Sequence, residues 1–287
     1  MRRWGATTRS WISAIRPATL TASVGPVLVG SALAHADGRL HLPSAAGALL
    51  GAALIQIGTN LVNDVADFRR GADGEDRLGP PRAVQQGWLT ERAVTRAAFA
   101  AFAGALVVGA ALVARGGWPV VLIGTASVSA GIAYTAGPWP LGYHGLGDVF
   151  VLAFFGVVAV CGTYFVQALT VTPTVVAASV AIGSLATAIL VVNNLRDRET
   201  DARVGKRTLA VRFGARFARA EYAALLGSAY VISASFGWLA PLLTLPWAAA
   251  EVRAIRSADG AALNPHLGRT AGLGLAFCAL LAAGVVL

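Results

Sequence analysis

The stretch from Asn60 to Gln86 decides the fold, and it reads NLVNDVADFRRGADGEDRLGPPRAVQQ. An apolar run, residues 43–57, leads straight into it, so several acids stand at the end of a helix of about membrane-spanning length. At 100° per residue, Asn60, Asp64 and Asp67 lie within about 60° of one another on one helix face. Clustered hard oxygens at the mouth of a membrane helix suit Mg²⁺, although a solvated helix end is the simpler alternative for a single patch.

A second acid-rich stretch follows the apolar run 173–192. From Asn193 to Gly214 it reads NNLRDRETDARVGKRTLAVRFG. The interval from Asn193 to Asp197 repeats the amide-to-acid spacing of the first stretch, and Asp201 continues it. Because two acid-rich helix ends occur in one hydrophobic chain, a shared binding site is favoured over two solvated helix ends without a function.

The composition is that of a polytopic membrane protein with an all-α fold. Of the 287 residues, 56% are hydrophobic and only 13% are charged, with a mean hydropathy of +0.65. Soluble domains carry about 25% charged residues. Cys161 and Cys278 lie in apolar runs without the spacing of a redox pair, which favours packed thiols. His35, His41 and His266 lack metal-ligand spacing and are expected at the surface.

Nine apolar segments are long enough, or nearly so, to cross a bilayer. They are expected at about residues 18–34, 43–66, 92–114, 118–135, 148–169, 173–195, 217–237, 240–253 and 270–287. The arginines before the first segment also resemble a signal peptide, but the polar start is long, which favours a retained span.

The distribution of basic residues predicts the topology. With a cytoplasmic N-terminus, all of the 23 Lys and Arg residues except Arg39 and Arg115 fall on the cytoplasmic side. Both acid-rich stretches then end even-numbered spans on that same side. This suggests two similar four-helix halves and an appended ninth helix within a single domain, residues 1–287.

Cations are interleaved with the acids in both stretches. Four arginines surround the first and three cations follow the second: Arg69, Arg70, Arg77 and Arg82, and Arg203, Lys206 and Arg207. Topology alone explains many of them, but a pure topology signal needs no acids. Acid pairs, Mg²⁺ and cations together are what is needed to hold a diphosphate and to stabilise it as it leaves. In a membrane, the organic part of such a substrate is a lipid, and an apolar bundle would keep an allylic cation from water.

A third polar stretch, YTAGPWPLGYHGLGD, runs from Tyr134 to Asp148 on the same predicted side. Its glycines and prolines predict a structured turn. Tyr134, Tyr143, His144 and Asp148 are candidates to position an aromatic acceptor or to help remove its proton. Enrichment of aromatic residues at membrane interfaces is the alternative explanation.

These stretches resemble the UbiA superfamily of intramembrane aromatic prenyltransferases, and within it the branch that acts on 1,4-dihydroxy-2-naphthoate in menaquinone synthesis. The resemblance rests on Arg16-Pro17 at the first span, on NDxxDxxxGxD from Asn63 to Asp73 with EDRLGPPRAVQQG after it, and on the two later stretches. It implies a helical bundle of about nine spans around a central cavity, which binds Mg²⁺ and a polyprenyl diphosphate.

The residues at matching positions form the candidate site. The predicted metal ligands are Asp64, Asp67, Asp73, Asp197 and Asp201. The predicted catalytic residues are Asp64, Asp67, Asp197, Asp201 and Lys206. The predicted substrate-binding residues are Asn60, Asn63, Arg77, Arg82, Tyr134, Tyr143, His144, Asn193, Asn194 and Arg207. Many superfamily members carry an acid where this chain has Gly71, which leaves open whether Asp73 or Asp76 is a ligand.

The implied reaction moves the prenyl chain to the ring carbon that bears the carboxylate, with loss of CO₂ and diphosphate. Another aromatic acceptor, such as 4-hydroxybenzoate or homogentisate, is the nearest alternative. A cation-coupled transporter is disfavoured because the charges gather at one face instead of the bilayer midplane. The basic residues are explained by topology, so no nucleic acid partner is expected. The expected setting is the plasma membrane of a bacterium, with the active site facing the cytoplasm.

Overall fold

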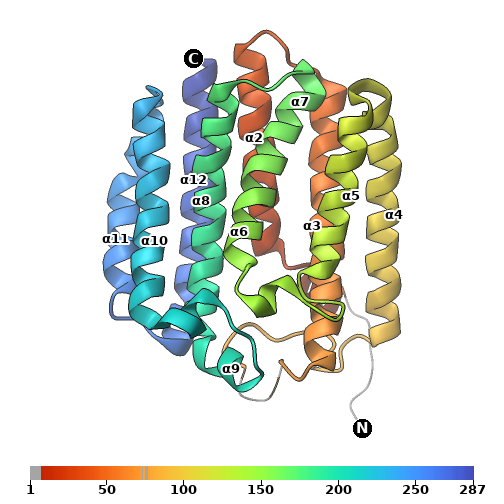
Figure 1. Cartoon of the computed structure of the whole chain (residues 1–287), viewed down its shortest axis with the longest axis vertical. Coiled ribbons are helices and arrows are strands. Elements are labelled where there is room, and N and C mark those ends of the chain that lie inside the picture. Colours follow the sequence, from red (N-terminus) through yellow and green to blue (C-terminus); the bar gives the residue numbers. More distant parts are fainter. Residues whose placement is uncertain (1–7, 73, 75–76) are drawn as a thin grey trace.

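Helices make up all the regular structure of the described residues, as the sequence predicts. The structure is a computed structural model that describes residues 8–72, 74 and 77–287. Figure 1 shows the long helices side by side, with the connections at the two ends of the bundle. The long helices are α2 (Pro17–Ala36), α3 (Leu42–Arg69), α4 (Glu91–Gly116), α5 (Trp118–Ala133), α8 (Pro173–Arg196), α10 (Leu209–Ser235) and α12 (Asn264–Val286).

Shorter elements complete the fold. They are α1 (Thr8–Ile15), η1 (Leu141–His144), α6 (Gly147–Val151), η2 (Leu152–Cys161), α7 (Gly162–Ala168), α9 (Arg198–Arg203), η3 (Ala240–Thr244), α11 (Leu245–Ile255) and η4 (Gly260–Leu263). The segments α6, η2 and α7 follow one another without a break, and η2 is a π-helix.

All nine expected spans fall on helical segments. Six of these segments are long and apolar enough to cross a membrane by length and composition, among the residues that the structure describes. Of the other three, α5 and α11 are short, and α10 carries several arginines. The predicted count of nine is therefore approximate.

Local sequence signals explain where the helices start. Thr90, Thr172 and Thr208 each accept a hydrogen bond from the backbone N–H three residues on, which caps α4, α8 and α10. Prolines stand in the first turn of α2, α3, α5, α8 and α12, where a missing N–H does no harm. In α10 the backbone at Gly214 leaves the helical region with φ 84°, so the helix is kinked near its start.

The most buried long helix is α8, and the main core forms around it. It meets the π-helix η2 at two glycines: a side chain on Gly156 would lie 2.5 Å from the Ser179 carbonyl oxygen, and one on Gly183 would lie 2.7 Å from that of Leu152. Small residues allow this close approach of two backbones. The contact holds the middle of α8 against the α6–α7 run, and the second acid-rich stretch follows at the end of the same helix.

One expectation about the surface is wrong. His266 is buried at the start of α12, where its Nδ1 lies 2.6 Å from Oε2 of the buried Glu251 on α11. The two residues are far apart in the sequence, so spacing alone could not reveal this pair.

Candidate active site

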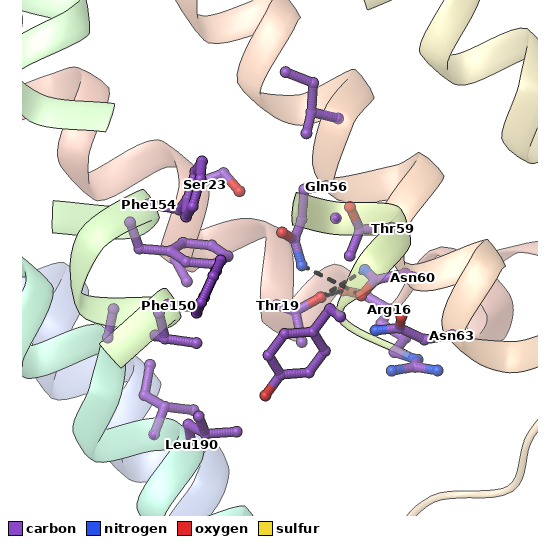
Figure 2. Close-up of a pocket in the computed structure, with 18 of the residues that line it drawn as sticks. Arg16, Thr19, Ser23, Gln56, Thr59, Asn60, Asn63, Phe150, Phe154 and Leu190 are labelled. Carbon is purple, nitrogen blue, oxygen red and sulfur yellow. Dashed lines mark hydrogen bonds between the residues drawn. The ribbon is translucent and has the colours of Figure 1, made fainter. Parts of the chain in front are cut away.

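A cavity of about 730 Å³ occupies the centre of the bundle. Figure 2 shows Arg16, Asn60 and Asn63 on one side of it, with Phe150 and Phe154 opposite. The cavity is therefore polar on one wall and aromatic on the other. Both acid-rich stretches contribute to its lining, since α3 and α8 end at the same end of the bundle (Figure 1).

Among the described acids of the first stretch, Asp67 lines the cavity. Arg82 donates from Nη2 to Asp67 Oδ2 at 3.2 Å, and the Tyr143 hydroxyl donates to Oδ1 at 3.0 Å. A buried carboxylate needs such partners. The two oxygens of Asp67 therefore accept from two segments that are distant in the sequence, one at Arg82 and one at Tyr143.

Asp64 does not line the cavity, although it shares the helix face of Asp67. Its side chain is buried, with 1% exposed, and neither oxygen has a hydrogen-bond partner among the described residues. It faces the backbone amides of Ala83 and Val84, and Arg16 acts on its charge more strongly than Arg77 does. Its predicted role as a metal ligand therefore finds no support in its position.

Asp197 lies directly after the last residue of α8 and lines the cavity. The preceding Arg196 donates to both of its oxygens, from Nε at 2.7 Å and from Nη2 at 2.5 Å. The same guanidinium donates to Asn193 Oδ1 at 2.8 Å and to Asn264 Oδ1 at 3.2 Å. Arg196 thus joins α8 to the start of α12.

Asp201 on α9 is paired with the only lysine of the chain. Lys206 Nζ donates to Asp201 Oδ1 at 3.2 Å, while Oδ2 is buried without a partner among the described residues. Burial raises the pKa of Asp201, and Lys206 opposes this rise. For Lys206 itself, burial lowers the pKa, but the charges of the surrounding acids outweigh this and raise it. Both groups therefore depend on their charged neighbours.

Tyr143 connects the two acid-rich stretches. Its hydroxyl donates to Asp67, and Arg70 and Lys206 stand over its ring at 5.2 Å and 5.8 Å from the centroid. Its carbonyl oxygen accepts from the Arg207 backbone N–H at 2.8 Å. Burial raises the pKa of Tyr143, and the charge of Asp67 adds to the rise, so the phenol is a donor at neutral pH. It acts here as a contact between two loops.

The donor set fits a divalent cation. Asp67, Asp197 and Asp201 are close enough that the charges of the first two raise the pKa of the third, and one oxygen of Asp201 is still unpaired. Carboxylate oxygens that lie this close together are the kind of ligand that Mg²⁺ binds. No three His, Cys, Asp or Glu side chains converge on one point within residues 8–72, 74 and 77–287. An ion here would take one or two carboxylates and complete its shell with water and phosphate, as Mg²⁺ commonly does.

The amides of the two stretches have different surroundings. Asn60 holds the start of α2, because its Nδ2 donates to the Ile15 carbonyl and to Thr19 Oγ1, both at 2.8 Å. Figure 2 shows Asn60 beside Thr19. Asn63 accepts from the Thr135 hydroxyl. All the predicted amides line the cavity, including Asn193 and Asn194.

The remaining predicted residues divide into two groups. Arg77, Arg82, Tyr134 and Lys206 line the cavity. His144 and Arg207 do not: the His144 ring stacks on Trp139 at 4.3 Å, with Nδ1 2.9 Å from the Pro140 carbonyl oxygen, and Arg207 is exposed. Asp73 and Asp76 lie outside the described residues.

Three residues that sequence reasoning did not single out belong to the site. Arg196 and Thr135 line the cavity, and Asn264 holds Arg196. Arg196 had a signal, since it immediately precedes Asp197, but positive-inside statistics made that arginine unremarkable. Asn264 is joined to the site only by the fold.

A helical bundle with clustered carboxylates and cations at one end of an otherwise apolar cavity defines a class: membrane enzymes for substrates with an anionic head and an apolar tail. The sequence comparison makes this specific. Residues 23–264 match the UbiA prenyltransferase family, and the chain belongs to this family.

Curated relatives and a solved structure agree with this assignment. A 1,4-dihydroxy-2-naphthoate octaprenyltransferase from Escherichia coli is 39% identical over 279 residues, 92% of this chain and 90% of the relative. One of the same name from Mycobacterium tuberculosis is 38% identical over 285 residues, 96% of each chain. The structure of a UbiA homolog from Archaeoglobus fulgidus bound to GPP and Mg²⁺ has a TM-score of 0.69, with 18% identity over 96% of this chain and 99% of that one, and shows the shared fold.

Proposed function

We propose that the chain is a Mg²⁺-dependent prenyltransferase that moves a polyprenyl chain from its diphosphate to 1,4-dihydroxy-2-naphthoate. CO₂ and diphosphate leave, and demethylmenaquinol is the product, a step of menaquinone biosynthesis. The observation that carries this proposal is the cavity that joins three carboxylates and several cations to apolar, aromatic walls. The names of the relatives supply the acceptor, and their identity of up to 39% over most of the chain supports its transfer to this protein.

The metal is proposed at Asp67, Asp197 and Asp201, which line the cavity, and not at Asp64, which does not. One or two of these carboxylates would hold Mg²⁺, and the ion would neutralise the charge that builds up on the diphosphate as it leaves. The solved homolog with GPP and Mg²⁺ is consistent with this use of a divalent ion.

The cations of the cavity are proposed to hold the diphosphate directly. Arg77, Arg82, Arg196 and Lys206 all line the polar end, and Arg77 and Arg196 both pack against Gly79. The two guanidinium groups lie beside the same glycine, and guanidinium binds phosphate in a bidentate fashion.

The apolar wall is proposed to receive the prenyl chain and to exclude water from the reacting carbon. Phe150 and Phe154 line it as a stacked pair, with ring centroids 5.8 Å apart. Aromatic faces carry negative electrostatic potential, which attracts a nearby cation.

We further propose that the protein is a multi-pass protein of a bacterial plasma membrane, with the polar end of the cavity at the cytoplasmic face and a single domain over residues 1–287. The positive-inside distribution supports the orientation. The cavity is lined from Ser13 to Ala271, which favours one folding unit.

The test is an assay of the purified protein in detergent with Mg²⁺ and a prenyl diphosphate. 1,4-Dihydroxy-2-naphthoate and 4-hydroxybenzoate are offered separately, and product mass and released CO₂ are measured. Prenylated, decarboxylated naphthol from the first acceptor alone is expected. Prenylation of hydroxybenzoate alone would reject the acceptor, and no product from any aromatic acceptor would reject the proposal.

A further inference from the structure

A second cavity, of about 410 Å³, lies between α3, α4 and α5 and is separate from the central one. Figure 1 shows these three helices together at one side of the bundle. The lining residues run from Val62 to Arg70 on α3 and from Thr95 to Phe102 on α4. Each run covers about 10–12 Å of helix. The cavity is therefore a groove that follows the helices inward from the acid-rich end of the bundle.

The inner part of the groove is apolar. Phe102 closes it, because the ring packs on Gly58, where a Cβ atom would lie 2.7 Å from the nearest ring carbon. Val62 and Ile132 line the walls, and Phe99, with 69% of its surface exposed, stands at the outer edge. An empty groove of this kind loses dispersion contacts along its walls. In a bilayer, an acyl chain is the apolar group at hand to fill it.

The mouth of the groove is basic. Arg69 and Arg70, at the end of α3, line it directly. On α4, Arg92 and Arg96 are exposed and lie within about 60° of Phe99 round the helix, two turns and one turn closer to the mouth. Among the described residues, Glu91 is the acid paired with these arginines.

These arginines keep donors for a further partner. The ion pair with Glu91 uses Nε of Arg69 at 2.7 Å, and 65% of the Arg69 side chain is exposed. Arg70 uses Nη2 for the Gly137 carbonyl oxygen. The side chains of Arg92 and Arg96 have no hydrogen bond or ion pair within the described part of the chain. A guanidinium group has five N–H donors, so most of those at the mouth remain available.

The mouth lies at the depth of lipid headgroups. Helix α3 has 28 residues and is therefore about 42 Å long. A bilayer is about 40–45 Å thick with its headgroup regions, and its hydrocarbon core is about 30 Å thick. Because Arg69 is the last residue of α3, the arginines reach the headgroup region while Val62 and Phe102 lie in the hydrocarbon.

We propose that this groove binds a phospholipid with an anionic headgroup, whose phosphate lies among the four arginines and whose acyl chain lies along Phe99 and Phe102. Basic pockets between membrane helices on the cytoplasmic side bind anionic lipids in this way. The site rests on the membrane setting and orientation of the proposed function, but not on its chemistry.

Charge complementarity selects this occupant. The positive-inside bias accounts for arginines on this side of the membrane, but it does not require them to surround an apolar groove. A zwitterionic headgroup brings no net charge to the mouth, whereas an anionic one does. Each basic residue near the membrane surface is expected to strengthen the binding of an anionic lipid on the order of fivefold.

The test counts lipids bound to the full-length protein by native mass spectrometry, with phosphatidylglycerol or phosphatidylcholine added to the detergent at matched concentrations. We expect the first phosphatidylglycerol to bind at least about 25-fold more tightly than phosphatidylcholine, the effect of two arginines. Arg69→Gln and Arg92→Gln should each weaken phosphatidylglycerol binding about fivefold or more and leave phosphatidylcholine binding unchanged. Equal binding of the two lipids by the wild type would overturn the proposal.

Arg216→Gln is the matched control, because Arg216 is exposed beside the exposed Phe213 and Phe217 on α10 but lines neither cavity. It should bind phosphatidylglycerol like the wild type, and a loss equal to that of Arg92→Gln would reduce the effect to general surface charge. Ala66→Phe keeps the arginines but fills the floor of the groove, so it should lose the tight lipid. Unchanged binding in this variant would reject the groove, and thermal unfolding without added lipid checks that each variant is folded.

Two competitors identify the occupant. Glycerol 3-phosphate, a headgroup without a tail, should not displace phosphatidylglycerol, and displacement would make the mouth a site for free phosphate groups. Geranyl diphosphate should not displace it either, and displacement would assign the groove to the prenyl substrate. Both results would overturn the proposal. Because none of these measurements depends on turnover, failure of the prenyl transfer assay would reject the proposed function and leave the lipid site standing.

Discussion

Arg196→Gln should destabilise the protein because it breaks a buried ion pair. The Arg196 side chain is 1% exposed and donates to Asp197 twice, at 2.7 Å and 2.5 Å. It also donates to Asn193 and Asn264. Glutamine keeps much of the side-chain volume but cannot reach all these acceptors or neutralise Asp197. The variant therefore leaves a carboxylate largely buried and without its cation.

The magnitude follows from burial. Removing one partner of a buried ion pair costs about 3–5 kcal/mol. Because Asp197 is at the cavity wall and water can partly replace the guanidinium, we expect the lower end, about 3 kcal/mol. For a chain of this size, about 2–4 °C of unfolding temperature corresponds to each kcal/mol, which gives a fall of about 6–12 °C.

Arg198→Gln is the matched control, two residues further along. Its partner Glu199 has 74% of its side chain exposed, at 3.4 Å. Exposed pairs contribute about 0–1 kcal/mol, so this variant should shift the unfolding temperature by no more than about 4 °C. Thermal unfolding of the three purified proteins in one detergent measures both shifts. Equal shifts in the two variants would refute the assignment of Arg196 as a buried structural cation.

Three further outcomes follow from the site and the packing. Asp67→Asn should lower kcat/KM at least about 100-fold and Asp64→Asn by about tenfold or less, since only Asp67 of these two lines the cavity. The rate of product formation by both variants checks this. A larger loss in Asp64→Asn than in Asp67→Asn would reject the metal assignment. Chelation of divalent ions should abolish diphosphate release, and added Mg²⁺ should restore it, while release that survives chelation would exclude metal dependence. Gly156→Ala should cost about 3 kcal/mol, because its Cβ atom would meet the backbone oxygen of Ser179, whereas Gly227→Ala, with open space, should be neutral or slightly stabilising in the same unfolding assay.

The sequence predicts the helical bundle and the position of both acid-rich stretches because each signal is local. Apolar runs of membrane-spanning length become helices, and the acids that follow them mark the helix ends. Some helix starts also have a local signal, since Thr90, Thr172 and Thr208 cap the helices that follow them, although α10 begins at Leu209 and not near residue 217 as expected. Basic residues then place both acid-rich ends on one side.

The choice between Asp64 and Asp67 could not be predicted in the same way. On a helix the two side chains are only about 60° apart, and periodicity assigns them to one face. The neighbouring segment decides which of the two lines the cavity. The loop at Ala83 and Val84 covers Asp64, whereas Asp67 accepts hydrogen bonds from Tyr143 and Arg82. That loop is placed by a small apolar cluster with the end of α3 and the start of α4, a tertiary feature.

The cations are harder to predict than the acids for a related reason. In a membrane protein, most arginines on the cytoplasmic side need no partner, so their presence carries little information. Arg196 differs because Asn264 accepts from its guanidinium and donates to the Leu78 carbonyl oxygen at 2.8 Å, which joins α8, α12 and the loop after α3. Three segments distant in the chain thus fix one guanidinium beside one carboxylate. A charge held in this way costs little further ordering when an anion arrives, which supports the proposal that this end of the cavity binds the diphosphate.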